Sequence, residues 1–237
     1  MTALQPGSIG VSHCAFEDDL LRVAVSPLGA SRAPDQGREA RTIEEGAIIM
    51  TQDIQLLEKA LTHTAQLLGN TTPGQYGLPT PCDDFDVRAL ANHMVAGNPY
   101  FATLAGGGAA DFALFGQDNI GERQPGEVYA EGVKEALAAW QAEGALQRHM
   151  PLPGGGLGPR LADVYLLEAV LHGWDLATAT GQDRAGDPDA VEAVFRRWYG
   201  NYPDAARPQT GLFGPAKAVA EDAPVLDRLA AYFGRTV

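Results

Sequence analysis

The apolar residues of segment 161–180 recur at the spacing of an α-helix. This stripe consists of Leu167, Val170, Leu171 and Trp174. Residues three and four apart share one face of a helix, and an apolar face of this width needs a surface to pack against. The segment contains no proline and is rich in residues that favour helices. We therefore predict a buried helix over 161–180 that ends near Gly181.

The same periodicity marks five further segments, each bounded by glycine, proline or a residue that can cap a helix. We predict helices over residues 51–68, 85–104, 125–143, 188–199 and 224–233. Asp83 or Asp84 is expected to cap the helix over 85–104, and Asp187 the helix over 188–199. Pro99 is expected to kink or interrupt the helix that contains it.

Strand signals are sparse, and only residues 216–219 have a short strand-like pattern. A glycine-rich loop over 106–121 carries Phe112, Leu114 and Phe115, which are expected to fold over the domain. Four helices of bundle length joined by glycine-rich connections predict an all-α fold. The expected architecture is a four-helix bundle with additional helices at the C-terminal end.

Residues 1–49 have no sustained periodicity, and they mix glycine, proline, serine and both signs of charge. We expect a disordered N-terminal extension over 1–49, with room for a short strand or helix near 20–26. Met50 stands just before the first predicted helix and resembles a natural start. The helical domain is therefore expected to span residues 50–237.

Composition excludes several classes of partner. The 237-residue chain has a formal net charge of −13 and a pI of about 4.7, which argues against binding nucleic acid. No apolar run approaches the roughly 20 residues that span a membrane, and no signal peptide is evident. Cys14 and Cys82 are the only cysteines, and they form no disulfide framework or metal knuckle. A reducing, cytoplasmic setting is expected.

Two polar residues interrupt the apolar face of the helix over 161–180. Glu168 and His172 are four residues apart, so they point to the same side. A buried carboxylate is costly unless it is paired or bound to a cation. His93 lies among apolar neighbours on a second predicted helix. Two imidazoles and one carboxylate form the ligand set of a catalytic zinc site or another divalent-metal site, with one coordination position open.

These residues can also have purely structural roles, and those interpretations stay open at this point. A histidine on an apolar face is more often an ordinary core residue than a metal ligand, and Glu168 and His172 can simply hydrogen-bond to each other. Asp175 is placed either to accept a hydrogen bond from His172 or to lie exposed. His63 is expected to face solvent, and His149 to be ordinary surface.

Two residues near the second predicted helix have alternative roles. Cys82 precedes the helix, where the helix dipole can make a thiol reactive, although packing at this junction is the more common role. Arg88 can meet an anionic substrate, but pairing with a nearby acid such as Asp84 is favoured.

Two segments of the chain resemble a known family. Residues 80–95 (TPCDDFDVRALANHMV) are similar to the pattern TPC-x-x-W-x-V-R-x-L-x-x-H-x-V, and residues 168–182 (EAVLHGWDLATATGQ) to E-x-x-x-H-x-W-D-L-A-x-A-T-G. Both patterns resemble the mycothiol-dependent maleylpyruvate isomerase metal-binding domain family of the DinB-like superfamily. The tail, residues 212–216 and 226–234, resembles the end of an actinobacterial-type subgroup.

The resemblance implies a DinB-like four-helix bundle over residues 50–237. It implies a metal, usually zinc, held by His93, Glu168 and His172, the same three residues that the spacing singles out. Phe85 stands where the family commonly has tryptophan. The isomerase itself carries a separate C-terminal domain that the short tail here does not supply, so maleylpyruvate isomerisation does not carry over.

Two functions follow as hypotheses. The first is a divalent-metal enzyme that uses a low-molecular-weight thiol such as mycothiol, either as an S-transferase or as a thiol-dependent isomerase, on an electrophilic substrate. The second is a non-catalytic binding or interaction module that the metal stabilises.

Overall fold

The computed structural model describes residues 39–83, 85–109, 111–150, 156–204 and 213–237, and its architecture is helical. The α-helices are α2 (Glu39–Gly69), α3 (Val87–Ala105), α4 (Pro125–Gln141), α5 (Gly158–Thr180), α6 (Pro188–Trp198) and α7 (Val225–Tyr232). Two short 3-10 helices, η1 (Pro73–Gln75) and η2 (Phe112–Gly116), lie in the loops around α3. The predicted all-α class is confirmed.

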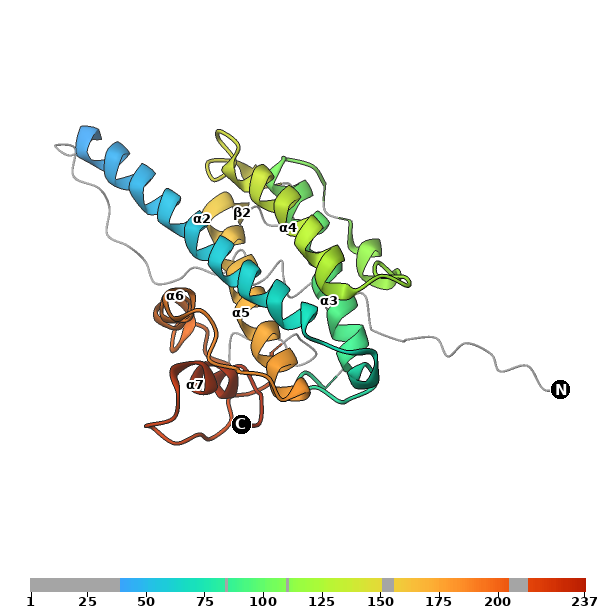
Figure 1. The fold of residues 1–237 in the computed structure, drawn as a ribbon. Coiled ribbons are helices and arrows are strands. Elements are labelled where there is room, and N and C mark those ends of the chain that lie inside the picture. The colour runs from blue at the N-terminus through green and yellow to red at the C-terminus, as the bar shows by residue number, and fades with distance from the viewer. Residues whose placement is uncertain (1–38, 84, 110, 151–155, 205–212) are drawn as a thin grey trace.

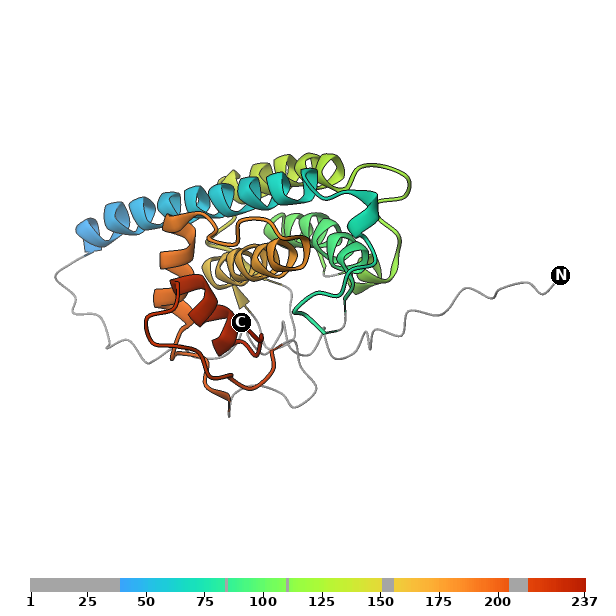
Figure 2. The same ribbon diagram turned by 60° about the horizontal axis from the view of Figure 1, so that its bottom comes forward.

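Four helices form the bundle. α4 packs against α2 and α3, and α5 packs against the same two helices from the other side (Figure 1). α6 and α7 pack on α5, and a second view keeps these tail helices on one side of the bundle (Figure 2). The tryptophans Trp140, Trp174 and Trp198 are fully buried, so one continuous core joins the bundle to its tail.

Helices α2 and α4 approach each other closely at a glycine, Gly126. A Cβ atom added at Gly126, in the first turn of α4, would lie 2.5 Å from the backbone nitrogen of Gly69 at the end of α2. Real side chains never approach backbone that closely, so only glycine allows this contact. Gln124 fixes the same junction by donating from Nε2 to the carbonyl oxygens of Gly69 and Thr71.

Several predicted boundaries differ from the structure. α2 begins at Glu39 rather than Thr51, and in Figure 1 its first turns reach beyond the other helices. The interpretation of residues 1–38, including the short element near 20–26, lies outside the described residues. The remaining bundle and tail helices agree with their predicted ranges to within three residues.

Local details of α3 and the tail also correct the prediction. Asp86 caps α3 by accepting a hydrogen bond from the Ala89 nitrogen, which excludes Asp83 from that role, and Asp84 lies outside the described residues. α3 continues through Pro99 without a break. Residues 216–219 form no strand, because their backbone has no neighbouring strand to pair with among the described residues. The only described strands are β1 (His149–Met150) and β2 (Gly156–Leu157), which form a minimal antiparallel hairpin.

No helix in the described part of the chain is long and apolar enough to cross a membrane.

Candidate metal centre

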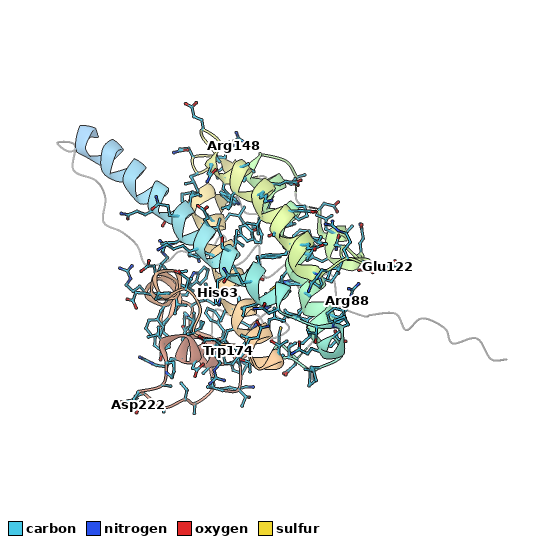
Figure 3. The ribbon with its side chains drawn as sticks, viewed as in Figure 1. His63, Arg88, Glu122, Arg148, Trp174 and Asp222 are labelled. Carbon is cyan, nitrogen blue, oxygen red and sulfur yellow. The ribbon has the colours of Figure 1, made fainter. Side chains whose placement is uncertain are left out.

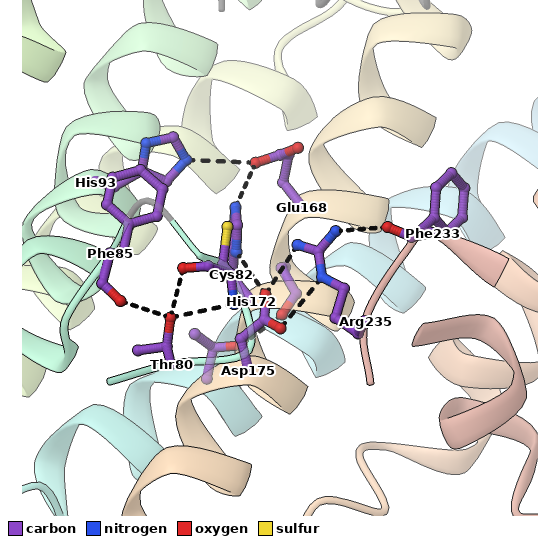
Figure 4. A network of polar contacts seen from close by, with 11 residues as sticks. Thr80, Cys82, Phe85, His93, Glu168, His172, Asp175, Phe233 and Arg235 are labelled. Carbon is purple, nitrogen blue, oxygen red and sulfur yellow. Dashed lines mark hydrogen bonds and ion pairs between the residues drawn. The ribbon is translucent and has the colours of Figure 1, made fainter. Parts of the chain in front are cut away.

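The three residues singled out in the sequence meet inside the bundle. His93 comes from α3, and Glu168 and His172 come from successive turns of α5. One oxygen of Glu168, Oε2, lies 3.2 Å from Nε2 of His172 and 3.5 Å from Nε2 of His93. The ligand atoms of all three residues lie within 4.8 Å of one another. Figure 4 shows the two imidazoles converging on this carboxylate.

These separations fit a tetrahedral metal site. With zinc–nitrogen and zinc–oxygen bonds of about 2.0–2.1 Å, neighbouring ligand atoms of a tetrahedron stand about 3.3 Å apart. The two measured separations, 3.2 and 3.5 Å, bracket that value. The donor set of two imidazoles and one carboxylate is also one that zinc accepts, so the residues present fit a divalent metal.

A second set of polar contacts orients His172. Its Nδ1 lies 3.1 Å from Oδ2 of Asp175, and Asp175 is completely buried. Because an ionised carboxylate only accepts hydrogen bonds, Nδ1 of His172 carries a proton that is directed at Asp175, and Nε2 faces Glu168. Of the two roles considered for Asp175, the structure supports the hydrogen bond with His172, and the exposed alternative is wrong.

The charges of the site stabilise one another. Burial alone would raise the pKa of Glu168, but the attraction and hydrogen bonds of the two imidazoles outweigh burial and hold its pKa well below its ordinary value. Burial opposes protonation of His172 as well, yet Glu168 and Asp175 together raise its pKa to about 9. His93 is different, because burial dominates and lowers its pKa. Without metal, the site is therefore a buried ion pair of Glu168 and protonated His172.

Aromatic rings enclose the imidazoles. The ring centroid of His93 lies 5.1 Å from that of Phe85 and 5.1 Å from that of Phe115 in η2. The predicted folding of the loop over the domain is confirmed by this contact, and Phe85 occupies the aromatic position of the motif beside the site. A cavity of about 20 Å³ adjoins the three polar residues, and its other lining is mostly apolar and aromatic, with Met94, Phe101, Tyr129 and Tyr165.

The comparisons with known proteins are consistent with this site. Residues 57–177 match the family of the mycothiol maleylpyruvate isomerase N-terminal domain. The chain belongs to that family. It is a mycothiol-related, metal-binding family with a DinB-like fold, and the matched residues include all three candidate ligands.

Two relatives of this protein come from two strains of Mycobacterium tuberculosis, and both are uncharacterized proteins. Each is 32% identical over 192 residues, which cover 76% of this chain and 96% of the relative. No solved structure matches the chain.

The other residues considered in the sequence, His63, His149 and Arg88, do not belong to the group formed by His93, Glu168 and His172. His63 is half-buried on α2 and lines a separate small cavity with Trp174, near which Figure 3 places it. His149 is exposed, as predicted. Arg88 binds an acid, Asp118, through Nη2 at 3.0 Å, and the predicted partner Asp84 lies outside the described residues.

Two further residues lie beside the candidate site, Cys82 and Arg235, and the sequence pattern does not predict Arg235 there. The sulfur of Cys82 lies within 4.8 Å of ligand atoms of His172 and Asp175, although packing was the favoured role for Cys82 and a reactive thiol only the alternative. Arg235, two residues before the last, binds Asp175 through two nitrogens. The family motif marks Cys82, but no local pattern marks Arg235, because its partner is 60 residues earlier in the chain.

Proposed function

We propose that this protein is a divalent-metal enzyme that uses a low-molecular-weight thiol such as mycothiol, as an S-transferase or a thiol-dependent isomerase. The observation that carries the proposal is the convergence of His93 Nε2, Glu168 Oε2 and His172 Nε2 at 3.2–3.5 Å contacts to the shared carboxylate oxygen. In this proposal these three residues hold the metal, with zinc as the expected ion. A reducing, cytoplasmic setting belongs to the same proposal, since the thiol must stay reduced.

Bound there, a zinc ion would leave one position for a thiol and favour its thiolate. The protein's own groups prepare that position. Asp175 holds the His172 ring so that Nε2 faces the ligand set, while Phe85 and Phe115 shield the imidazoles from water. Among the described residues no Lys or Arg lines the cavity beside the ligands, so an uncharged, apolar electrophile suits it better than a dicarboxylate.

The test combines metal content with thiol transfer. Protein purified without added metal or chelator is expected to contain one zinc per chain and to join thiols, mycothiol among them, to model electrophiles. His172→Ala should lose both properties. His149→Ala is the matched control, because His149 is exposed in the β1–β2 hairpin and should behave as wild type. Metal-loaded wild type that is as inert as His172→Ala across a broad panel would contradict the proposal.

A second function is favoured by the small size of the cavity. About 20 Å³ is room for roughly one water molecule, which suits a closed structural metal site as well as an enzyme pocket. Cys82 is a candidate for a fourth protein ligand, because its sulfur lies within 4.8 Å of a ligand atom of His172, whereas Asp175 already binds His172 and Arg235 and His63 lines another cavity. X-ray absorption at the zinc edge, without added thiol, separates the two functions. A zinc–sulfur distance that disappears in Cys82→Ser would favour the metal-stabilised module.

A further inference from the structure

The C-terminal tail reaches back into the bundle and ends beside the candidate metal centre. Arg235 is only 4% exposed. Its Nε donates to Oδ1 of Asp175 at 3.2 Å, and its Nη2 donates to Oδ2 of the same carboxylate at 2.9 Å (Figure 4). This is a bidentate arginine–carboxylate pair, which fixes both partners in one plane. The carboxylate that orients His172 is therefore itself held by the last turn of the chain.

The backbone around Arg235 is also constrained. Its nitrogen donates to the carbonyl oxygen of Ala230, and its Nη1 donates to the carbonyl oxygen of Phe233 at 3.1 Å. The preceding residue, Gly234, has a φ of 91°, and a Cβ there would lie 2.7 Å from the Cα of Gly214. Only glycine makes this turn without strain, and the turn directs the guanidinium at Asp175.

The contact links the tail to a proposed metal ligand in two steps. Oδ2 of Asp175 accepts from both Arg235 Nη2 and His172 Nδ1. Removing Arg235 would leave the fully buried Asp175 carboxylate with His172 as its one described hydrogen-bond donor and without its fixed cation, so Asp175 would turn or admit water. Either change frees the His172 ring to rotate and moves Nε2 away from Glu168.

We propose that Arg235 is a positioning residue of the metal centre, which holds His172 through Asp175 with Nε2 directed at the metal. The inference rests on the proposed function, because it gives Arg235 a role only if His93, Glu168 and His172 bind a metal. The tail is then part of the site and not merely a cover for the bundle.

A second tail contact provides the comparison that separates positioning from simple docking. Asp227 in α7 accepts from Trp174 Nε1 at 2.8 Å and from Arg184 Nη2 at 2.9 Å. These contacts also tie the tail to α5, at Trp174 directly before Asp175, but no described hydrogen bond or ion pair joins them to His172. A residue that only docks the tail should therefore behave like Arg184.

The experiment measures zinc affinity in the full-length chain by competition with a chromophoric chelator. Wild type, Arg235→Met, Arg235→Lys and Arg184→Met are compared at one pH, well below the unfolding temperature of the least stable variant. Arg235→Met is expected to weaken zinc binding roughly 10- to 100-fold, the usual effect of losing an outer-shell partner. Arg235→Lys keeps the charge but loses the fork, so it should fall between Arg235→Met and wild type. Arg184→Met should stay within about twofold of wild type.

A spectroscopic measurement accompanies the affinities. In zinc-loaded wild type, long-range proton–nitrogen NMR correlation should show His172 with its only ring proton on Nδ1, and in zinc-loaded Arg235→Met that signal should broaden or shift. If Arg235→Met does not fold, Arg235→Lys carries both measurements.

The two proposals fail in different ways. Wild type that binds no zinc would defeat the proposed function, and this inference with it. Wild type that binds zinc while both Arg235 variants bind it equally well, with the His172 signal unchanged, would overturn the inference alone.

Discussion

A single carboxylate oxygen, Oε2 of Glu168, serves both imidazoles of the candidate site. Glu168→Gln keeps the shape of the side chain but removes the charge, so zinc loses an anionic ligand. We expect zinc affinity to fall by at least the 10- to 100-fold that loss of an outer-shell partner causes. Chelator competition measures this change. Glu131→Gln, which removes an exposed partner of Arg123, should leave zinc affinity unchanged, and equal affinity in both variants would contradict the ligand assignment.

The raised pKa of His172 makes the stability of the metal-free protein depend on pH. The pKa is about 9 in the folded chain, against an ordinary value of 6.5. Between these values the folded protein keeps a proton that the unfolded chain has released. The free energy of unfolding should therefore fall as pH rises from 6.5 to 9, by roughly 3 kcal/mol if His172 acts alone. Urea unfolding of chelator-treated protein at several pH values measures this slope.

Two comparisons identify the source of that slope. His172→Gln carries no titrating ring at this position, so its stability should not fall over the same range. Zinc-loaded wild type should also lose the decline, because a coordinated imidazole is already neutral. A flat pH profile for metal-free wild type would show that His172 is not held as an ion pair with Glu168.

The sequence could predict site residues that lie close together on one helix. Glu168 and His172 share a helical face because of their spacing, and Asp175 stands one turn further on. Arg235 and the Asp118 partner of Arg88 could not be found in this way, because contacts between distant segments depend on how the helices pack.

At the scale of helices and loops, apolar periodicity predicted the elements that have a buried face. It failed for the first turns of α2, because a segment that extends beyond the bundle needs no apolar stripe. The predicted cap of α3 was also wrong, since three neighbouring acids, Asp83, Asp84 and Asp86, offered equivalent capping groups, and it is Asp86 that accepts from the Ala89 nitrogen. Residues 216–219, which have a strand-like pattern, have no neighbouring strand among the described residues. A short apolar alternation is therefore not enough without a neighbour to pair with.

The contact between α2 and α4 yields a prediction at the same scale. Gly126→Ala places a methyl group against the backbone of Gly69, which cannot move without separating the helices. We expect a loss of about 1–3 kcal/mol, the usual cost of overpacking, seen as a lower urea midpoint. Gly69→Ala is the matched control from the other side of the contact. A Cβ at Gly69 meets nothing within 4 Å, so stability should be unchanged or slightly higher. Equal losses in both variants would contradict the close approach.

At the scale of the whole molecule, the candidate site joins parts of the chain that are distant in sequence. α3 contributes His93, α5 contributes two proposed ligands, and the tail contributes Arg235. The protein is strongly acidic, with a net charge of −13, so its overall field favours the approach of a cation. The specific attraction comes from Glu168 and Asp175 inside the bundle.

This arrangement predicts that zinc stabilises the entire fold and not only its site. A metal bound to α3 and α5 binds the folded protein alone, since the unfolded chain does not bring the ligands together. Free zinc at about 100 times its dissociation constant should add about 2.7 kcal/mol, which raises the melting temperature of a chain this size by roughly 5–10 °C. Thermal unfolding with zinc and with excess chelator measures the shift. His93→Ala leaves both proposed ligands on α5 and removes the link to α3, so zinc should no longer raise its melting temperature. A shift equal to that of wild type would mean that the stabilising metal binds elsewhere on the acidic surface.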